Sequence, residues 1–256
     1  MYYYNSCKDD SQVEDKIMEL AFKHPAEGQD KIYYRIRNQG ILWNKKRVRR
    51  VYLRLSLHKH MKKRKRLPAR IKEPLFIPGQ PNEVWSMDFM HDSLQNGRKF
   101  RVLNVLDDYN REVLAIEPHL SIGSKLVTQV LDQIVHEKGL PKVIRVDNGP
   151  EFIATTLGDW CKERKIRLQF IQPGKPTQNG YIERFNRTYR QNILDAYSFD
   201  NLYQVRILSE EWMNEYNYTR PHDALKGKSP VQYRLTNQSI EASFDALITS
   251  TIQQMN

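Results

Sequence analysis

The alternation of strand-like and helix-like segments after residue 84 most constrains what this chain can fold into. Apolar and polar residues alternate, or β-branched residues accumulate, in three consecutive segments, which predicts strands at residues 84–91, 99–108 and 111–119. Helical and strand patterns then take turns, with helices predicted at 124–139, 155–165 and 179–190 and strands at 142–149 and 167–173. The order β-β-β-α-β-α-β-α predicts an α/β fold, in which helices flank a mixed five-stranded sheet that begins as a meander.

Residues 1–58 show a different pattern of three short amphipathic segments. The first opens with Ser11 and Glu14 at the spacing of a capping box, and Asn44 is placed to cap the third. A small helical domain is therefore expected here. The third segment would expose five cations, Lys45, Lys46, Arg47, Arg49 and Arg50. They suit the recognition helix of a helix-turn-helix domain in a DNA major groove, and they equally suit a solvated basic face on a small bundle.

The charge of the chain favours a polyanionic partner. Lysine and arginine number 41 against 30 acidic residues, a formal net charge of +11, and nucleic acid is the leading candidate. Residues 59–72 hold eight lysines or arginines and no acid, and a proline- and glycine-containing segment follows. Residues 59–82 are thus predicted to be a basic linker, with Lys62, Lys63 and Arg64 among its DNA contacts. A catalytic core is expected at residues 83–235 and a tail without lysine or arginine at 236–256.

Several classes of protein are disfavoured by the sequence. No apolar run approaches the roughly 20 residues that a membrane-spanning helix needs, and the first 30 residues lack the layout of a signal peptide. A cytoplasmic protein without a membrane partner is expected. The two cysteines, Cys7 and Cys161, have no spacing that predicts a metal clip or a redox pair.

Three acidic residues stand out because they are not placed as ordinary surface acids. Asp88 interrupts an apolar strand segment, Asp147 follows the strand-like run VIRV directly, and Glu183 opens the basic helix NGYIERFNRTYR. An acid inside an apolar strand is costly unless it meets a cation, and the carboxyl ends of strands gather ligands in open α/β sheets. Asp147 and Glu183 are 36 positions apart, so 35 residues separate them.

Carboxylates from three different elements predict a site for a hard cation. Mg²⁺ prefers oxygen ligands and usually keeps several waters, so substrate phosphate can complete its shell. Two such ions roughly 3.5–4 Å apart would serve an in-line displacement at phosphorus. Arg187 and Arg190 follow Glu183 by four and seven residues and are predicted to present cations to the DNA backbone from the same helix face. Three unrelated surface acids remain the alternative explanation.

The motifs WSMDF, VDNGPEF, NGYIERFNRTYR and EYNYTRPHDALKGKSP, in this order, resemble the catalytic half of bacterial insertion-sequence transposases, in the family named after insertion sequence three. The resemblance runs from about Val84 to Tyr233 and implies membership of the retroviral integrase superfamily with its D-D-35-E acids. It implies an RNase H-like core in which Asp88, Asp147 and Glu183 bind two Mg²⁺ ions, with Mn²⁺ as a substitute. Residues before the linker resemble, more loosely, the helix-turn-helix segment that precedes the core in these proteins.

The resemblance also implies partners. The complete transposase of this family is commonly a frameshift fusion with an upstream reading frame, so this chain is expected to be the downstream product and to act with the upstream one or fused to it. Double-stranded DNA, both transposon end and target, is the expected substrate. Because two DNA ends must be handled together, a homo-oligomer on DNA is expected.

Other polar residues have competing explanations. Asp92, Asp107 and Asp108 compete with Asp88 for the first carboxylate position, although the pair 107–108 is typical of a turn between hairpin strands. Glu151 could reach the site from Asp147, or cap a helix. The loop at residues 173–180 offers Lys175, Gln178 and Asn179 as DNA contacts, or is a plain connector. Asn217, Arg220 and His222 are given a structural or DNA-positioning role without a more specific assignment.

The sequence therefore predicts a DNA transposase that hydrolyses a phosphodiester at the element end and directs the exposed 3′-OH at a second phosphate. Two alternatives stay open. One is a hydrolytic nuclease of the same fold without strand transfer. The other is a non-catalytic DNA-binding repressor, against which the three intact acids argue.

Overall fold

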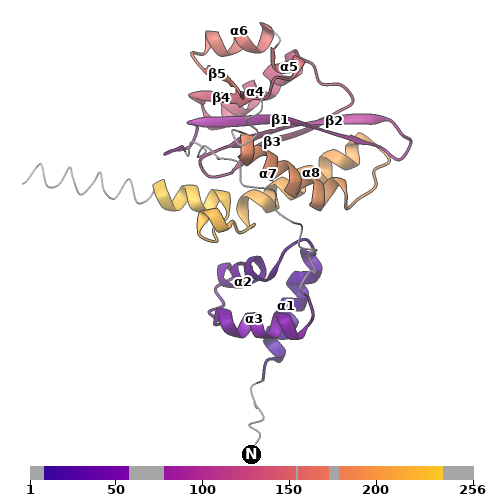
Figure 1. The fold of residues 1–256 in the computed structure, drawn as a ribbon, viewed down its shortest axis with the longest axis vertical. Coiled ribbons are helices and arrows are strands. Elements are labelled where there is room, and N and C mark those ends of the chain that lie inside the picture. The colour runs from indigo at the N-terminus through magenta and orange to yellow at the C-terminus, as the bar shows by residue number, and fades with distance from the viewer. Residues whose placement is uncertain (1–8, 58–77, 154, 173–178, 239–256) are drawn as a thin grey trace, which may run out of the picture. The chain divides into compact units, whose positions relative to one another are not determined.

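The computed structural model describes residues 9–57, 78–153, 155–172 and 179–238 (Figure 1). The chain divides into two compact units. Among the described residues, 9–57 and Arg220–Lys228 form the first, which we call the helical unit, and the rest form the sheet unit. The segment Arg220–Lys228 lay inside the predicted core of residues 83–235, but the structure groups it with the N-terminal helices.

The sheet unit contains the predicted mixed five-stranded sheet, which is confirmed. Its strands are β1 (Val84–Ser93), β2 (Lys99–Asp107), β3 (Val113–His119), β4 (Val143–Val146) and β5 (Arg167–Phe170). The first three form an antiparallel meander, β4 pairs in parallel with β1, and β5 pairs in parallel with β4. The resulting order, β3-β2-β1-β4-β5, places β1 at the centre, so a residue in its middle is surrounded by the rest of the unit.

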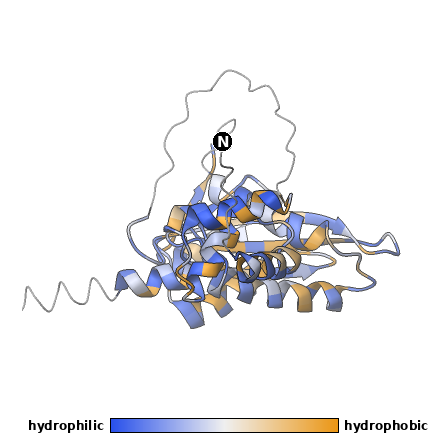
Figure 2. Ribbon diagram, turned by 90° about the horizontal axis from the view of Figure 1, so that it is seen from below, coloured by the Kyte–Doolittle hydropathy of each residue, from blue (hydrophilic) through white to orange (hydrophobic). Residues whose placement is uncertain are grey.

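Helices cover both faces of the sheet, as Figure 1 shows. On one face lie α4 (Ser124–Lys138), α5 (Pro150–Ile153) and α6 (Thr155–Glu163). On the other lie α7 (Gly180–Tyr189), extended by a π-helical turn at Arg190–Leu194, and α8 (Leu202–Tyr218). Residues 230–238 are also helical. Hydrophobic and hydrophilic residues alternate along the helices in Figure 2, as expected for amphipathic helices at a sheet surface.

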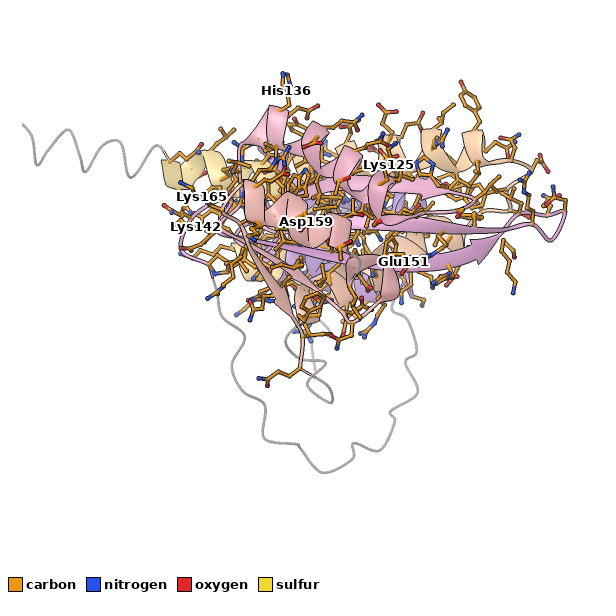
Figure 3. The ribbon with its side chains drawn as sticks, turned by 90° about the horizontal axis from the view of Figure 1, so that it is seen from above. Lys125, His136, Lys142, Glu151, Asp159 and Lys165 are labelled. Carbon is orange, nitrogen blue, oxygen red and sulfur yellow. The ribbon has the colours of Figure 1, made fainter. Side chains whose placement is uncertain are left out.

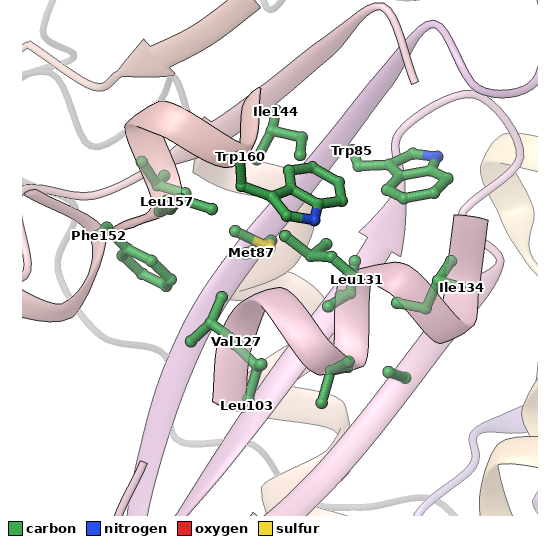
Figure 4. Packing of buried hydrophobic residues seen from close by; sticks show 14 of the residues in the cluster. Trp85, Met87, Leu103, Val127, Leu131, Ile134, Ile144, Phe152, Leu157 and Trp160 are labelled. Carbon is green, nitrogen blue, oxygen red and sulfur yellow. The ribbon is translucent and has the colours of Figure 1, made fainter. Parts of the chain in front are cut away.

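Each face has its own hydrophobic core, and β1 contributes to both. Trp85 and Met87 join the cluster under α4 and α6, which includes Leu131 and Trp160 (Figure 4). Met90, on the other side of the strand, joins the cluster under α7 and α8. Side chains alternate along a strand, so Ser86 and Asp88 also lie on the face of α7. The alternation that the sequence predicted for this strand is confirmed.

The helical unit contains α1 (Ser11–Lys23), α2 (Gln29–Asn38) and α3 (Lys45–Arg54), together with a 3₁₀ turn at Asp223–Leu225. Ile17, Ile32, Ile36 and Val48 form the centre of its core, with no exposed surface. The unit thus buries one apolar stripe from each of its three helices.

The two predicted helix caps of this unit have different outcomes. The side chain of Asn44 caps α3 by accepting the Lys46 backbone N–H at 2.8 Å, as predicted. The predicted capping box of Ser11 and Glu14 is wrong: Ser11 is the first helical residue, and its N–H donates to the Asp9 carboxylate at 2.9 Å. Glu14 instead forms an ion pair with Arg54.

None of the helices within the described ranges is long and apolar enough to cross a membrane.

Candidate active site

Asp88 lies in the middle of β1, on the sheet face that α7 covers. Its Oδ2 atom accepts a hydrogen bond of 2.8 Å from Asn186 Nδ2 of α7, and its Oδ1 accepts the backbone N–H of Phe89 at 2.8 Å. An ionised carboxylate has about four lone-pair positions, so each oxygen retains capacity for a further ligand. The strand and the helix together fix the orientation of this carboxylate.

A buried amide pair stands behind Asp88. Asn104 of β2 is the direct cross-strand neighbour of Asp88, and its Nδ2 donates to Asn186 Oδ1 at 2.7 Å. Both asparagines are buried. An ionised carboxylate only accepts hydrogen bonds, so Asn186 must turn its amide nitrogen toward Asp88 and its oxygen toward Asn104. The pair thereby links the two central strands to the helix that carries Glu183.

Asp147 follows β4 directly, at the carboxyl end of the strand, as the sequence predicted. Its Oδ1 accepts the backbone N–H of Gly149 at 3.0 Å, a local turn that holds the carboxylate. A Cβ atom on Gly149 would lie 3.0 Å from that same oxygen, so a side chain there would crowd it. The Asn-Gly dipeptide after the strand therefore serves to present Asp147.

Glu183 lies in the first turn of α7 and its side chain is exposed. The apolar residues Ile182, Phe185 and Tyr189 of the same helix are buried against the sheet, which fixes the rotation of the helix about its axis. Asn186 follows Glu183 by three residues, so the two side chains lie on neighbouring positions of one helix face. The residue that holds Asp88 is thus one turn away from the third acid.

The three acids are electrostatically coupled. Burial, and after it the charges of Asp147 and Glu183, raise the pKa of Asp88 from its ordinary 3.8 to about 6, against the hydrogen bonds from Phe89 and Asn186. No ion pair joins any of the three to a lysine, arginine or histidine within the described ranges. Three carboxylates from β1, the end of β4 and α7 therefore form a negative cluster that no cation of the described residues pairs with.

This donor set suits a divalent hard cation. Carboxylate oxygens are the ligands that Mg²⁺ and Mn²⁺ prefer, and a bound cation would offset both the burial and the repulsion that raise the pKa of Asp88. Cys161, in contrast, is buried in the apolar cluster under α6, and burial raises the pKa of its thiol to about 11. A soft-metal or nucleophilic role for this cysteine is thus disfavoured.

The competing acids of the first carboxylate position all have basic or backbone partners. Asp92 pairs with Arg190 at 3.2 Å, and Asp108 pairs with Arg145 at 2.9 Å. Asp107 accepts the backbone N–H groups of Asn82 and Tyr109, both at 2.8 Å, at the turn that the sequence predicted. Asp92 and Asp108 are thus paired with cations and Asp107 is held by two backbone N–H groups, whereas Asp88 has no ion pair within the described ranges.

Glu151 is also engaged. It lies on α5 (Figure 3), four positions after Asp147 in the sequence, and forms an ion pair with Arg101 of β2. That hydrogen bond, outweighing burial, holds the pKa of Glu151 below its ordinary value. The Arg101 guanidinium also lies 4.3 Å from the centre of the Phe89 ring, which stacks on Phe152. Glu151 therefore fastens α5 to the sheet.

The predicted DNA contacts on α7 and its preceding loop differ in exposure and in their partners within the protein. Arg187 is exposed, whereas Arg190 donates to the His91 carbonyl at 2.7 Å and pairs with Asp92. Asn179 is buried, and its Oδ1 has no hydrogen-bond partner within the described chain. Lys175 and Gln178 lie outside the described residues.

The five predicted cations of α3 also differ in whether they pair with an acid. Arg47 and Arg50 both pair with the buried Asp10, at 2.8 and 2.7 Å, and Lys45 pairs with Asp30 at 2.8 Å. Lys46 and Arg49 are exposed, and neither forms an ion pair within the described part of the chain. The linker residues Lys62, Lys63 and Arg64 lie outside the described residues.

Two of the three motif residues left without a specific role have clear contacts. The Asn217 side chain accepts the Val113 backbone N–H and donates to the Val113 carbonyl, both at 2.8 Å, and so pairs with the edge strand β3 as another strand would. Arg220 pairs with Glu27 at 3.2 Å inside the helical unit. Both contacts are structural.

Sequence reasoning missed Asn104, Asn186 and Arg101. The signal for Asn104 was available, because a single asparagine inside the apolar run VLNVL is expected to have a buried partner. Its partner could not be named, since Asn104 and Asn186 are 82 positions apart.

Comparisons with known proteins agree with this geometry. Two family models described as integrase core domain match residues 78–176 and 164–230, and all three acids fall within them: Asp88 and Asp147 in the first range and Glu183 in the second. An uncharacterized 31.7 kDa protein of insertion element IS407 from Burkholderia multivorans is 34% identical over 236 residues, which are 91% of this chain and 85% of that protein. The putative transposase InsK of IS150 from Escherichia coli K12 is 26% identical over 161 residues, 62% of this chain and 56% of its own length.

A solved structure shows the same fold. The simian T-cell lymphotropic virus intasome, in complex with the PP2A regulatory subunit B56 gamma, contains a chain that aligns with a TM-score of 0.52 at 18% identity. The alignment covers 86% of this chain and 74% of that one. The sheet unit is thus an RNase H-like fold of the retroviral integrase type, as the sequence predicted.

Proposed function

This chain belongs to the insertion-element transposases that carry a retroviral integrase-type core, enzymes of the polynucleotidyl transferase type, and we propose that Asp88, Asp147 and Glu183 are its catalytic residues. In this proposal the enzyme cleaves a phosphodiester at the transposon end and joins the freed 3′-OH to target DNA. The observation that carries the proposal is the coupling of the three carboxylates in a cluster that has no cation among the described residues.

We propose that the same three residues bind two Mg²⁺ ions, for which Mn²⁺ can substitute. Bound Mg²⁺ supplies charge stabilisation and an activated oxygen nucleophile for displacement at phosphorus. The contribution of the chain is orientation. The Asn104–Asn186 pair aims the Asp88 carboxylate, the Asn148-Gly149 turn aims Asp147, and the buried face of α7 sets the direction of Glu183.

DNA binding is proposed for two surfaces. On the sheet unit, exposed Arg187 is the cation of α7 best suited to a phosphate, with Lys175, Gln178 and Asn179 of the preceding loop. In the helical unit, Lys46 and Arg49 of α3 are the predicted contacts whose charge no acid of the described ranges neutralises. Because these contacts release counterions, affinity for duplex DNA should fall steeply between 50 and 200 mM salt, roughly tenfold for every two phosphate contacts.

The finer family assignment is part of the proposal. The motif order supports membership of the family named after insertion sequence three, in which this chain would be the downstream reading-frame product acting with, or fused to, the upstream one. Handling two DNA ends calls for a homo-oligomer on DNA. Such an enzyme acts in the bacterial cytoplasm, at the nucleoid.

The decisive experiment follows one labelled duplex through both chemical steps. Full-length chain is incubated with a duplex that carries its element end, with Mg²⁺, Mn²⁺ or EDTA, beside Glu183→Gln and the matched control Glu211→Gln, an exposed acid of α8. Metal-dependent nicking followed by joining of the 3′-OH end, lost in Glu183→Gln and kept in Glu211→Gln, is the expected result.

Other outcomes separate the alternatives. Nicking without joining, also when the 3′-OH end is supplied, would identify a hydrolytic nuclease. Metal-insensitive DNA binding by both the wild type and Glu183→Gln, without cleavage even when the upstream reading-frame product is added, would identify a repressor.

A further inference from the structure

Helix α2 of the helical unit makes contacts on two faces. Ile32 and Ile36 are fully buried in the core with α1 and α3. A second stripe, at Lys31, Tyr34, Arg35 and Asn38, has the i, i+3, i+4, i+7 spacing of one helix face. Arg35 is buried, yet it is not a member of the apolar core. This second stripe faces the segment Arg220–Lys228, which we call the strap.

A buried charge cluster joins the strap to α2. The Glu27 side chain has no exposed surface, and Arg35 donates to it twice, from Nε at 2.7 Å and from Nη2 at 2.8 Å. Arg220, at the start of the strap, pairs with the same carboxylate at 3.2 Å and is itself 5% exposed. Burial raises the pKa of Glu27, but the hydrogen bond from Arg35 and the charge of Arg220 outweigh it, so the carboxyl stays ionised.

The other end of the strap is fitted to Tyr34. Gly227 has φ +79°, a conformation that favours glycine, and a Cβ atom built there would lie 2.3 Å from Tyr34 Cδ1. The Gly227 carbonyl also accepts Asn38 Nδ2 at 3.3 Å. Glycine is thus required at this position both by its backbone conformation and by the aromatic ring that lies against it.

The strap is a closed loop rather than an extended tail. His222 and Lys228 form an antiparallel bridge, and the His222 carbonyl accepts the Gly227 N–H at 2.9 Å. Between them Leu225 is 2% exposed. A loop whose ends are tied in this way loses less conformational freedom on docking than a flexible segment, because its own hydrogen bonds already order it.

We propose that the strap is an integral fourth element of the helical unit, docked in cis on the second face of α2. The DNA-binding unit is then not residues 1–58 alone, because a segment more than 160 positions later completes it. The strap also packs against Tyr34 and Asn38 of the α2 stripe, which leaves less of α2 open to DNA. This inference goes beyond the proposed catalysis and does not depend on it.

Hydrogen exchange of the full-length chain, read by mass spectrometry in EDTA and without DNA, tests the proposal. Gly227→Val places a side chain against Tyr34, and Arg220→Gln leaves Glu27 with one cation fewer. Both are expected to speed amide exchange in α2 about tenfold or more, together with the strap. Exchange in α4 of the sheet unit should be unchanged. Ala224→Ser, an exposed strap residue, is the matched control.

A double-mutant cycle sharpens the test. If Arg220 acts through Glu27, adding Arg220→Gln to Glu27→Gln should change α2 exchange much less than it does in the wild type. Unchanged exchange of α2 in Gly227→Val and Arg220→Gln, with faster exchange in the strap alone, would overturn the proposal. Should Gly227→Val also speed exchange in α4, Gly227→Ala and Arg220→Lys replace the harsher variants, and the same comparison of α2 with α4 decides.

Discussion

Two clusters of acidic residues lie in the same sheet unit, and they differ in the cations that surround them. The site cluster comprises Asp88, Asp147 and Glu183, and the turn cluster comprises Asp107, Asp108 and Glu112 at the β2–β3 turn. In the turn cluster Asp108 has Arg145, and Glu112 has Lys138 at 2.9 Å and Arg234 at 3.0 Å. The site cluster has no such cation within the described ranges. Within the described residues, the fold thus supplies cations to two of the three acids of the turn cluster and to none of the site cluster.

A raised pKa alone does not distinguish the two clusters. Burial raises the pKa of Asp107 and Asp108 to about 6, as it does for Asp88. Structural acids inside a fold and functional acids at a site share this property. What separates Asp108 from Asp88 is the partner: Asp108 pairs with the Arg145 guanidinium, whereas Asp88 accepts from the Asn186 amide and the Phe89 N–H.

The largest expected effect is on catalysis, through the site cluster. Asp88→Asn removes a proposed metal ligand but keeps the shape of the side chain, so cleavage of a labelled element end in Mg²⁺ should fall by about 10⁴-fold or more. The fold should persist, because no cation of the protein loses its partner. Asp159→Asn, an exposed acid of α6 (Figure 3), is the control and should keep full activity. Retention of even a tenth of the activity in Asp88→Asn would contradict the assignment.

The next effect is on stability, through the turn cluster. Arg145→Leu leaves the buried Asp108 without its cation, which should lower the free energy of unfolding by about 3–5 kcal/mol in urea titrations. Arg167→Leu on the neighbouring strand β5 removes an exposed arginine. This variant should change the free energy of unfolding by less than about 0.5 kcal/mol. Equal stability of the two variants would show that the turn cluster is not held by its cation.

A smaller effect tests how the site cluster is oriented. Asn186→Ala removes the amide that aims Asp88 and should weaken Mg²⁺ binding by about 10–100-fold, measured by calorimetric titration and by the Mg²⁺ concentration for half-maximal cleavage. High Mg²⁺ should restore most of the activity. Thr188→Ala is matched, because the Thr188 hydroxyl donates to the Arg184 carbonyl of its own helix α7 and not to an acid of the site. An unchanged metal affinity in Asn186→Ala would assign the amide pair to packing alone.

The smallest expected effect is a pH dependence of stability. Because the folded pKa of Asp88 is about 6, above its ordinary 3.8, the folded chain holds this proton more tightly than the unfolded chain. Stability from this group is present below pH 4 and is lost as the pH rises through 6. Asp88→Asn cannot ionise, so in EDTA its advantage over the wild type should grow by about 1–2 kcal/mol between pH 4 and 7, after allowance for solvent screening.

Urea unfolding at a series of pH values measures this difference. Asp107 and Asp108 titrate in the same range but are present in both proteins, so their contributions cancel. A difference between the two proteins that stays constant with pH would contradict the raised pKa of Asp88.

Local patterns predicted the order of strands and helices in the sheet unit and the position of each acid along them. Trp85, Met87 and Asp88 show why this worked, since side chains alternate across a strand whatever lies opposite. The same holds for Asn44, whose capping bond reaches only two residues along the chain. The capping box at Ser11 failed because Asp9, two residues away, competed for the same N–H.

The tertiary structure alone decided which charges are used and which are neutralised. In the sequence, Arg190 and Arg187 are equivalent as cations on one helix face. In the structure, Arg190 donates to Asp92, which is 98 positions away, whereas Arg187 is exposed. The Asn104–Asn186 pair and the docking of the strap on α2 likewise join residues far apart in the chain. Hydrophobic periodicity encodes which face of an element is buried, whereas strand register and helix packing decide what that face meets, and these depend on the whole chain at once.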